Sequence, residues 1–203
     1  MDILPKRRSV RLPDYNYASL GFYFVTVCAY HHEHLFGEIV NNEMLLNDLG
    51  KVAQSCWLDI PTHYPKASID AHVIMPNHIH GIIIINSVGA NNYSPANVAD
   101  DNRLVRGTSK TIGAIVRGYK IGVTKWARLN GGQYCVWQRN YYERIIRYDR
   151  ELNNMRIYIA NNMLQWADDE ENINKLGVKI RANSHSPLRL FRVIPPSKPP
   201  IKF

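Results

Sequence analysis

Four consecutive isoleucines, Ile82 to Ile85, constrain this chain most, because the run is apolar, β-branched and only as long as a strand. They belong to the segment HIHGIIIIN at 78–86, which follows a second β-type segment, SIDAHVIM at 68–75. Pro76-Asn77 breaks the chain between the two, so the pattern predicts two neighbouring strands. No apolar run in the sequence approaches the roughly 20 residues that a membrane-spanning helix needs.

The rest of the chain alternates between strand and helix periods. Residues 21–30 are aromatic and β-branched and predict a strand, and residues 134–146 look extended. Apolar residues recur at helical spacing in 48–60, 109–128 and 149–166. Pro61 should end the first of these helices. The order strand, helix, strand, strand, helix, strand, helix predicts an α+β fold, a ferredoxin-like βαββαβ antiparallel sheet with an added C-terminal helix.

Composition shifts divide the chain into three parts. Residues 1–20 form a basic N-terminal arm, residues 21–170 the folded domain, and residues 171–203 a basic, proline-rich tail. Inside the domain, Asn41-Asn42 between LFGEIV and EMLLN indicates a β-hairpin. Residues 87–109 are rich in Asn, Ser, Gly and Asp and predict a long surface loop.

Cysteine usage and the N-terminus indicate the compartment. The 203 residues include three cysteines, which are odd in number and far apart, and this argues against a disulfide framework. The first ten residues, MDILPKRRSV, lack the apolar segment of a secretory signal peptide. A cytoplasmic protein is expected, with no membrane partner.

Positive charge is concentrated in blocks. The chain carries 25 Lys and Arg against 17 Asp and Glu, a formal net charge of +8. Residues 110–156 hold ten basic and three acidic groups, and residues 172–203 hold seven basic groups and no acid. Basic blocks separated by acidic or neutral segments indicate nucleic acid as the partner. The residues expected to contact DNA are Arg7, Arg8, Arg11, Arg117, Lys120, Arg139 and Arg144. For the arm, a solvated, frayed terminus is the alternative interpretation.

His78 and His80 form the first candidate site. Residues i and i+2 of a strand point to the same face, so both imidazoles should emerge side by side and could share one metal ion. Ile79 and Ile83 would point the opposite way, toward a core. Two exposed strand histidines without a metal are the alternative. His72 has the same parity, but the break at Pro76-Asn77 separates it from the pair, and it is interpreted as structural.

Tyr158 and Asn162 form the second candidate site. Their i, i+4 spacing places them one turn apart on the same face of the 149–166 helix, at the edge of its apolar stripe. From there they could reach past the core toward a neighbouring sheet. A phenol held there could be a nucleophile, and the amide oxygen could be a metal ligand. The alternative is a tyrosine packed at the core edge beside a surface or capping asparagine.

The order of these motifs resembles that of the REP-associated tyrosine transposases, a family of HUH single-strand DNA transposases. The matching segments are RRSVRLPDYNY, FVTVCAY, LFGEIV, HVIMPNHIHGIIII, TIGAIVRGYK, WQRNYYERIIR and YIANN, found between about residues 7 and 167. The family usually reads Tyr-Ile-x-x-Asn-Pro at the last motif, where Met163 replaces the proline here. The resemblance implies that His78, His80 and Asn162 are metal ligands and that Tyr158 is the nucleophile.

The resemblance also implies the reaction: cleavage and rejoining of single-stranded, hairpin-bearing DNA through a 5′-phosphotyrosine intermediate, with Mg²⁺ or Mn²⁺ as cofactor. The residue types suit this chemistry, because a phenolate can attack phosphorus and hold the strand as an ester. Two imidazoles and one amide are neutral ligands, so a bound ion would keep its double positive charge for the phosphate. The competing tyrosines Tyr141, Tyr142 and Tyr148 have no residue of ligand type four positions on.

Two rival functions fit the same pattern. A non-catalytic, single-stranded nucleic-acid-binding module of the same fold would expose aromatic residues on its sheet. A metal-dependent hydrolase that uses bound water would not need Tyr158. The sequence is compatible with a monomer or a homodimer.

Overall fold

A computed structural model describes residues 20–86, 111–131 and 135–168. Its main sheet has the strand order β4-β5-β1-β6. The strands are β1 Gly21–Cys28, β4 Ala67–Ile74, β5 His78–Ile85 and β6 Tyr142–Ile146. The predicted arm up to residue 19, the 87–109 loop and the tail lie outside the described residues. The division into arm, domain and tail therefore stays a prediction.

Strand pairing confirms the predicted topology. β1 lies between β5 and β6 and pairs antiparallel with both, and β4 pairs antiparallel with β5. The chain passes through helix α1 (Asp48–Leu58) between β1 and β4, and through helix α3 (Ile112–Asn130) between β5 and β6. This is the ferredoxin-like βαββαβ arrangement, with helix α4 (Asp149–Asn161) as the predicted C-terminal addition.

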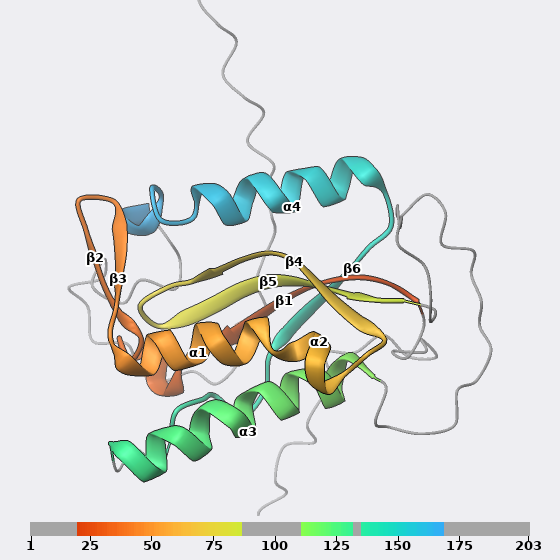
Figure 1. Ribbon diagram of the computed structural model, residues 1–203. Coiled ribbons are helices and arrows are strands. Elements are labelled where there is room, and N and C mark those ends of the chain that lie inside the picture. The colour runs from red at the N-terminus through yellow and green to blue at the C-terminus, as the bar shows by residue number, and fades with distance from the viewer. Residues whose placement is uncertain (1–19, 87–110, 132–134, 169–203) are drawn as a thin grey trace, which may run out of the picture. The chain divides into compact units, whose positions relative to one another are not determined.

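The helices cover opposite faces of the sheet. Helices α1 and α3, with the single-turn helix α2 (Ile60–His63), lie on one face, and α4 lies on the other (Figure 1). Side-chain caps help to set where two of them begin. The Asn47 side chain accepts a hydrogen bond from the backbone N–H of Gly50 (2.9 Å), and Thr111 Oγ1 accepts one from the N–H of Ala114 (3.2 Å).

Two predicted helix ends are wrong. The first helix ends at Leu58 rather than at Pro61, which lies in the first turn of α2, where its missing N–H leaves no bond unmade. The last helix ends at Asn161 rather than at residue 166, and a single 3-10 turn, Trp166–Asp168, follows after a short turn. Neither Gly nor Pro marks that second end in the sequence, so the apolar spacing predicted a longer helix.

The extended segment predicted over 134–146 is a strand only at its end. β6 covers Tyr142–Ile146, and Trp137 adds an isolated bridge to Ala29. The predicted hairpin is confirmed: β2 (Gly37–Val40) pairs with β3 (Glu43–Leu46) across Asn41 and Asn42, which both adopt positive φ. Asparagine tolerates that conformation better than most residues, and a two-residue turn of this kind matches strand twist.

The sheet carries apolar contacts on both faces. The main core lies between the sheet and helices α1 and α3 and includes Tyr23, Val25, Val27, Ile79, Ile83, Trp57, Ile115 and Tyr119. Gly81 leaves room in β5 for the indole of Trp57, which a side chain at this position would overlap. On the opposite face, buried Leu152, Met155 and Ile159 of α4 cover the sheet. None of the helices in the described ranges has both the length and the apolar character needed to cross a membrane.

Candidate active site beneath the last helix

β5 turns His78 and His80 toward α4, as the period of the strand predicts. The rings of the two histidines lie 4.4 Å apart between centroids, and both side chains are buried. Gly81, between them and the isoleucine run, faces Trp57 on the other side of the sheet. His72 pairs with Gly81 and its ring stacks near Trp57, 6.1 Å between centroids, so it faces away from the histidine pair. A register shift between Ile69 and His72 accompanies this placement.

Tyr158 reaches the histidine pair from α4. Its hydroxyl oxygen lies 3.2 Å from Nε2 of His80, and the two rings meet edge to face at 5.2 Å. Phe24 of β1 stacks on His80 at 5.3 Å and meets the edge of Tyr158 at 6.0 Å. Phe24 thus packs against both His80 and Tyr158, which are 78 positions apart in the sequence, and so limits the movement of both rings.

Asn162 lies in the sequence between two residues, Tyr158 and Trp166, whose rings are close to the histidine pair. Tyr158, four residues before it, contacts His80, and the ring of Trp166, four residues after it, lies 6.1 Å from that of His78. Asn162 keeps helical geometry (φ −60°, ψ −40°), so the predicted i, i+4 relation to Tyr158 holds although α4 ends one residue earlier. Its side chain is 1% exposed, and its Oδ1 has no hydrogen-bond partner among the described residues.

Hydrogen bonds reach the inner nitrogen of each imidazole. Nδ1 of His78 lies 2.8 Å from Oδ1 of Asn77, and Nδ1 of His80 lies 2.8 Å from Oγ1 of Thr26. Burial lowers the pKa of His80 to about 3, so its imidazole is neutral at neutral pH. A neutral imidazole offers a lone pair, as a metal ligand must.

His78, His80 and Asn162 are uncharged potential ligands, so they would leave the positive charge of a divalent ion unreduced. Among the described residues, no group of three or more His, Cys, Asp or Glu side chains is placed to hold a metal ion, so a third ligand taken from these residues would be of another type. The Asn162 amide oxygen is such a group, since it is buried and has no described partner. A buried polar atom that makes no bond within the protein is costly unless a ligand satisfies it.

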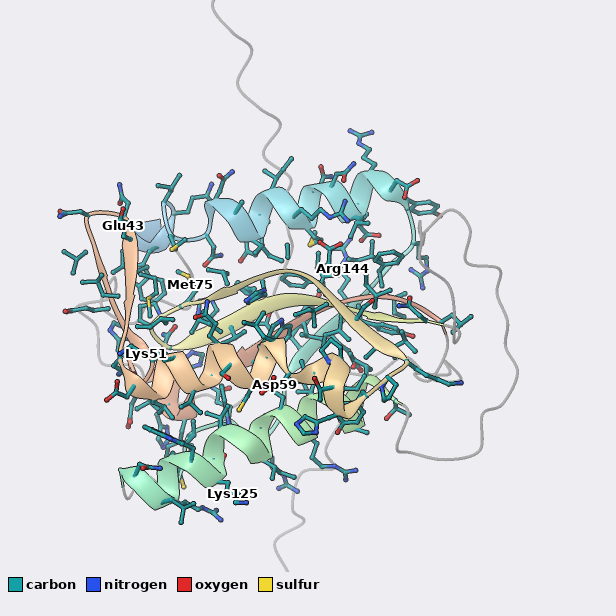
Figure 2. All side chains as sticks on the ribbon, in the orientation of Figure 1. Glu43, Lys51, Asp59, Met75, Lys125 and Arg144 are labelled. Carbon is teal, nitrogen blue, oxygen red and sulfur yellow. The ribbon has the colours of Figure 1, made fainter. Side chains whose placement is uncertain are left out.

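A basic groove lies on the other side of the sheet, along α3. It encloses about 670 Å³, and its cationic residues are Arg117, Lys120, Lys125, Arg128 and Arg139. Ile121 and Leu129, 60% and 75% exposed, add apolar surface. Figure 2 shows Lys125 on the side of α3 that faces away from the sheet. Three predicted DNA-contacting residues, Arg117, Lys120 and Arg139, thus share one surface.

The remaining predicted DNA contacts are placed differently. Arg144 of β6 binds Glu151 of α4 through Nε and Nη2, at 2.7 and 2.6 Å, so its charge is partly neutralised (Figure 2). Within the groove, Lys120 donates to the carbonyl oxygens of Gln138 and Asn140, and burial lowers its pKa to about 8. Arg7, Arg8 and Arg11 lie outside the described residues and stay predictions.

Sequence reasoning missed three residues beside the histidine pair. Thr26 is directly opposite His80 in the β1–β5 pairing, which no local pattern reveals. The sequence pattern predicts only a chain break at Asn77, although its position next to His78 could have indicated a contact with that imidazole. Trp166 was assigned to the apolar stripe of the last helix, whereas its ring lies near His78 and His34.

Comparisons with known proteins give a relative and a fold. A search of family models finds no match. A solved structure, a REP-associated tyrosine transposase bound to a REP hairpin, superposes with a TM-score of 0.52 and 18% identity, covering 78% of this chain and 74% of that one. This likeness confirms the expected fold. A Haemophilus influenzae protein described as uncharacterized is 50% identical over 165 residues, which are 81% of this chain and 92% of the relative. At that identity and coverage, the chain belongs to the same protein family as the H. influenzae protein.

Proposed function

We propose that this chain is a metal-dependent tyrosine transposase of the HUH type, which cleaves and rejoins single-stranded, hairpin-bearing DNA. One observation carries the proposal: the Tyr158 hydroxyl lies 3.2 Å from His80, whose ring lies 4.4 Å from that of His78. A potential nucleophile and two potential metal ligands, from elements far apart in the sequence, are therefore held at one place. The fold shared with a REP-associated tyrosine transposase supports the assignment.

In the proposed reaction, the Tyr158 oxygen attacks the phosphorus of a DNA phosphodiester. The bond from phosphorus to the 3′ oxygen breaks, so one strand end becomes a 5′-phosphotyrosine ester and the other a free 3′-OH. The phenol loses its proton to solvent, because the Nε2 lone pair of His80, which faces the hydroxyl, is assigned to the metal ion in this proposal. Attack of a 3′-OH on the ester reverses the sequence and rejoins the strand.

His78, His80 and Asn162 would hold the divalent ion, Mg²⁺ or Mn²⁺. When bound, the ion polarises the phosphate and stabilises the charge that develops at phosphorus. All three side chains are neutral, so they would leave the double positive charge of the ion undiminished. Phe24 limits the movement of Tyr158 and His80 by packing against both rings. The chain thus holds the nucleophile beside the ligands before DNA binds.

The α3 groove is the proposed surface for the DNA backbone. Its cations can pair with phosphates, and Tyr141, Ile121 and Leu129 supply apolar surface for bases. A binding module without catalysis is less well supported. Such a module needs aromatic rings exposed on its sheet, whereas Phe22 and Phe24 are at most 1% exposed.

The test is the covalent adduct. Wild-type protein, Tyr158→Phe and the control Tyr148→Phe are incubated with labelled hairpin-bearing single-stranded DNA and Mg²⁺ or Mn²⁺, then denatured and separated by electrophoresis. Tyr148 is a suitable control because it is 68% exposed at the start of α4. We expect a denaturation-resistant adduct with wild type and Tyr148→Phe and none with Tyr158→Phe. Cleavage that persists in Tyr158→Phe would indicate a hydrolase, and binding of the DNA without any cleavage would indicate a binding module.

A further inference from the structure

The histidine pair is supported by two polar residues that contact its inner nitrogens. Asn77 precedes β5 in the turn, and Thr26 lies opposite His80 on the neighbouring strand β1. Both are buried, at 0% and 2% exposure. Hydrogen bonds to one imidazole nitrogen determine which tautomer is present and therefore which nitrogen is left to bind a metal.

The Asn77 contact determines the tautomer of His78. An amide oxygen can only accept, so the Oδ1 of Asn77, 2.8 Å away, requires a hydrogen on Nδ1 of His78. The other end of the amide fixes its orientation, because Nδ2 of Asn77 donates to the carbonyl oxygen of His32 at 3.2 Å. Flipping the amide would bring two acceptor oxygens together at His32. His78 therefore carries its hydrogen on Nδ1 and its lone pair on Nε2.

The tautomer of His80 follows from two contacts together, one with Thr26 and one with Tyr158. A threonine hydroxyl can donate or accept, so this contact alone does not choose a tautomer. The contact at the other ring nitrogen determines the tautomer. Nε2 of His80 lies 3.2 Å from the Tyr158 hydroxyl, and a phenol is a stronger acid, and so a better donor, than the threonine alcohol at Nδ1. The phenol therefore donates to Nε2, and Nδ1–H of His80 donates to Thr26. Both imidazoles then have their lone pair on Nε2.

We propose that Asn77 and Thr26 are positioning residues, which hold His78 and His80 in the Nδ1–H tautomer, so that the lone pair of each ring is on Nε2, where one divalent cation can bind; at His80 the cation would replace the hydrogen bond from Tyr158. The cation is that of the proposed function, and the inference rests on it to that extent. The supports are rigid because one is fixed by the β1–β5 register and the other by the turn that begins β5. The ring centroids lie 4.4 Å apart, so the two imidazoles are neighbours on one face of β5.

The direct test reads the tautomers without metal or DNA. Protein labelled with ¹⁵N-histidine is examined by two-bond ¹H–¹⁵N correlation, and the signals of His78 and His80 are assigned with His78→Gln and His80→Gln. We expect the Nδ1–H pattern for both residues in wild type. An Nε2–H pattern at either one overturns the proposal. The tautomers are read in wild type, and the two variants serve only to assign its signals.

The second test measures Mn²⁺ affinity by calorimetry for wild type, Thr26→Val and Thr26→Ser. Valine keeps the shape of threonine but cannot accept a hydrogen bond, whereas serine retains the hydroxyl. Loss of a supporting hydrogen bond typically weakens metal binding by about 10- to 100-fold, which is expected for Thr26→Val and not for Thr26→Ser. Equal affinity of Thr26→Val and wild type, or no Mn²⁺ binding by wild type, overturns the proposal. The outcome is independent of the adduct assay, because a protein that forms no adduct can still show these tautomers and this affinity order.

Discussion

At the scale of single residues, Gly81 of β5 follows His80 of the candidate site and faces Trp57 in the main core. A Cβ atom at this position would overlap the indole of Trp57, which is fully buried against the sheet. We expect Gly81→Ala to lower the free energy of unfolding by about 1–3 kcal/mol, the usual cost of overpacking, as measured by urea denaturation. Because His80 precedes Gly81 on the opposite face, the displaced strand should also weaken Mn²⁺ binding.

Gly131 provides the matched control for that substitution. It follows the end of α3, has a negative φ, and a Cβ there would lie 3.5 Å from the carbonyl oxygen of Ala127, an ordinary contact distance. Gly131→Ala should change the free energy of unfolding by no more than about 0.5 kcal/mol. Equal effects of the two substitutions would contradict the role assigned to Trp57.

Residue positions that depend on one local period were predictable. The strand period places His78 beside His80, and the helix period places Tyr158 one turn from Asn162. The approach of the two pairs to each other depends on α4 crossing the sheet, and the sequence suggested it only through the family resemblance. Thr26 could not be predicted at all, because its contact with His80 requires the register of β1 against β5.

At the scale of elements, an ion pair ties α4 to the edge strand β4. Arg156 donates through Nε and Nη2 to the two carboxylate oxygens of Asp70, at 3.0 and 2.5 Å. Burial raises the pKa of Asp70, but the hydrogen bonds from Arg156 and the Ala71 N–H outweigh it and leave the pKa below the ordinary 3.8. The folded state therefore favours the carboxylate, and its stabilisation is present above pH 3.8 and lost as pH falls through the lowered pKa.

Asp70→Asn tests this link. At pH 7 the variant should lose about 0.5–1 kcal/mol of unfolding free energy, a modest value because Arg156 is 45% exposed and solvent screens the pair. The difference from wild type should shrink as pH is lowered below 3.8, measured by urea denaturation across that range. Arg156→Gln and the double variant complete a cycle that isolates the pair. A difference that stays constant with pH would contradict the assignment.

Element existence was predictable more fully than element ends. The apolar stripes of all three long helices are the faces that pack, as with Ile115 and Tyr119 of α3. The two wrong predictions are helix ends, which depend on tertiary contacts as well as on local sequence. Pro61 lies in the first turn of a new helix instead of ending one. α4 gives way to a turn before Trp166, whose ring lies near those of His34 and His78.

At the scale of the described part of the chain, the basic groove and the candidate active site lie on opposite faces of the sheet. The histidine pair contacts α4 and the basic groove follows α3. These two helices lie on opposite faces of the sheet (Figure 1). The net charge of +8 predicts a polyanion as the binding partner but does not indicate which face of the sheet would bind it. Under the proposed function, we therefore expect groove residues to contribute to DNA affinity and not to the chemical step.

The double variant Arg117→Ala/Arg128→Ala tests that separation. Both residues are exposed on the groove, so their loss should weaken binding of hairpin DNA and reduce the slope of log affinity against log salt by about 2, since each phosphate contact adds about one unit. Fluorescence anisotropy at several salt concentrations measures the slope. Lys51→Ala/Lys66→Ala removes the same charge from exposed positions outside the groove and should leave the slope nearly unchanged. At saturating DNA, both double variants should form the Tyr158 adduct at the wild-type rate, because neither alters the face beneath α4. A slower adduct step in the groove variant at saturation would show instead that the α3 surface takes part in the chemistry.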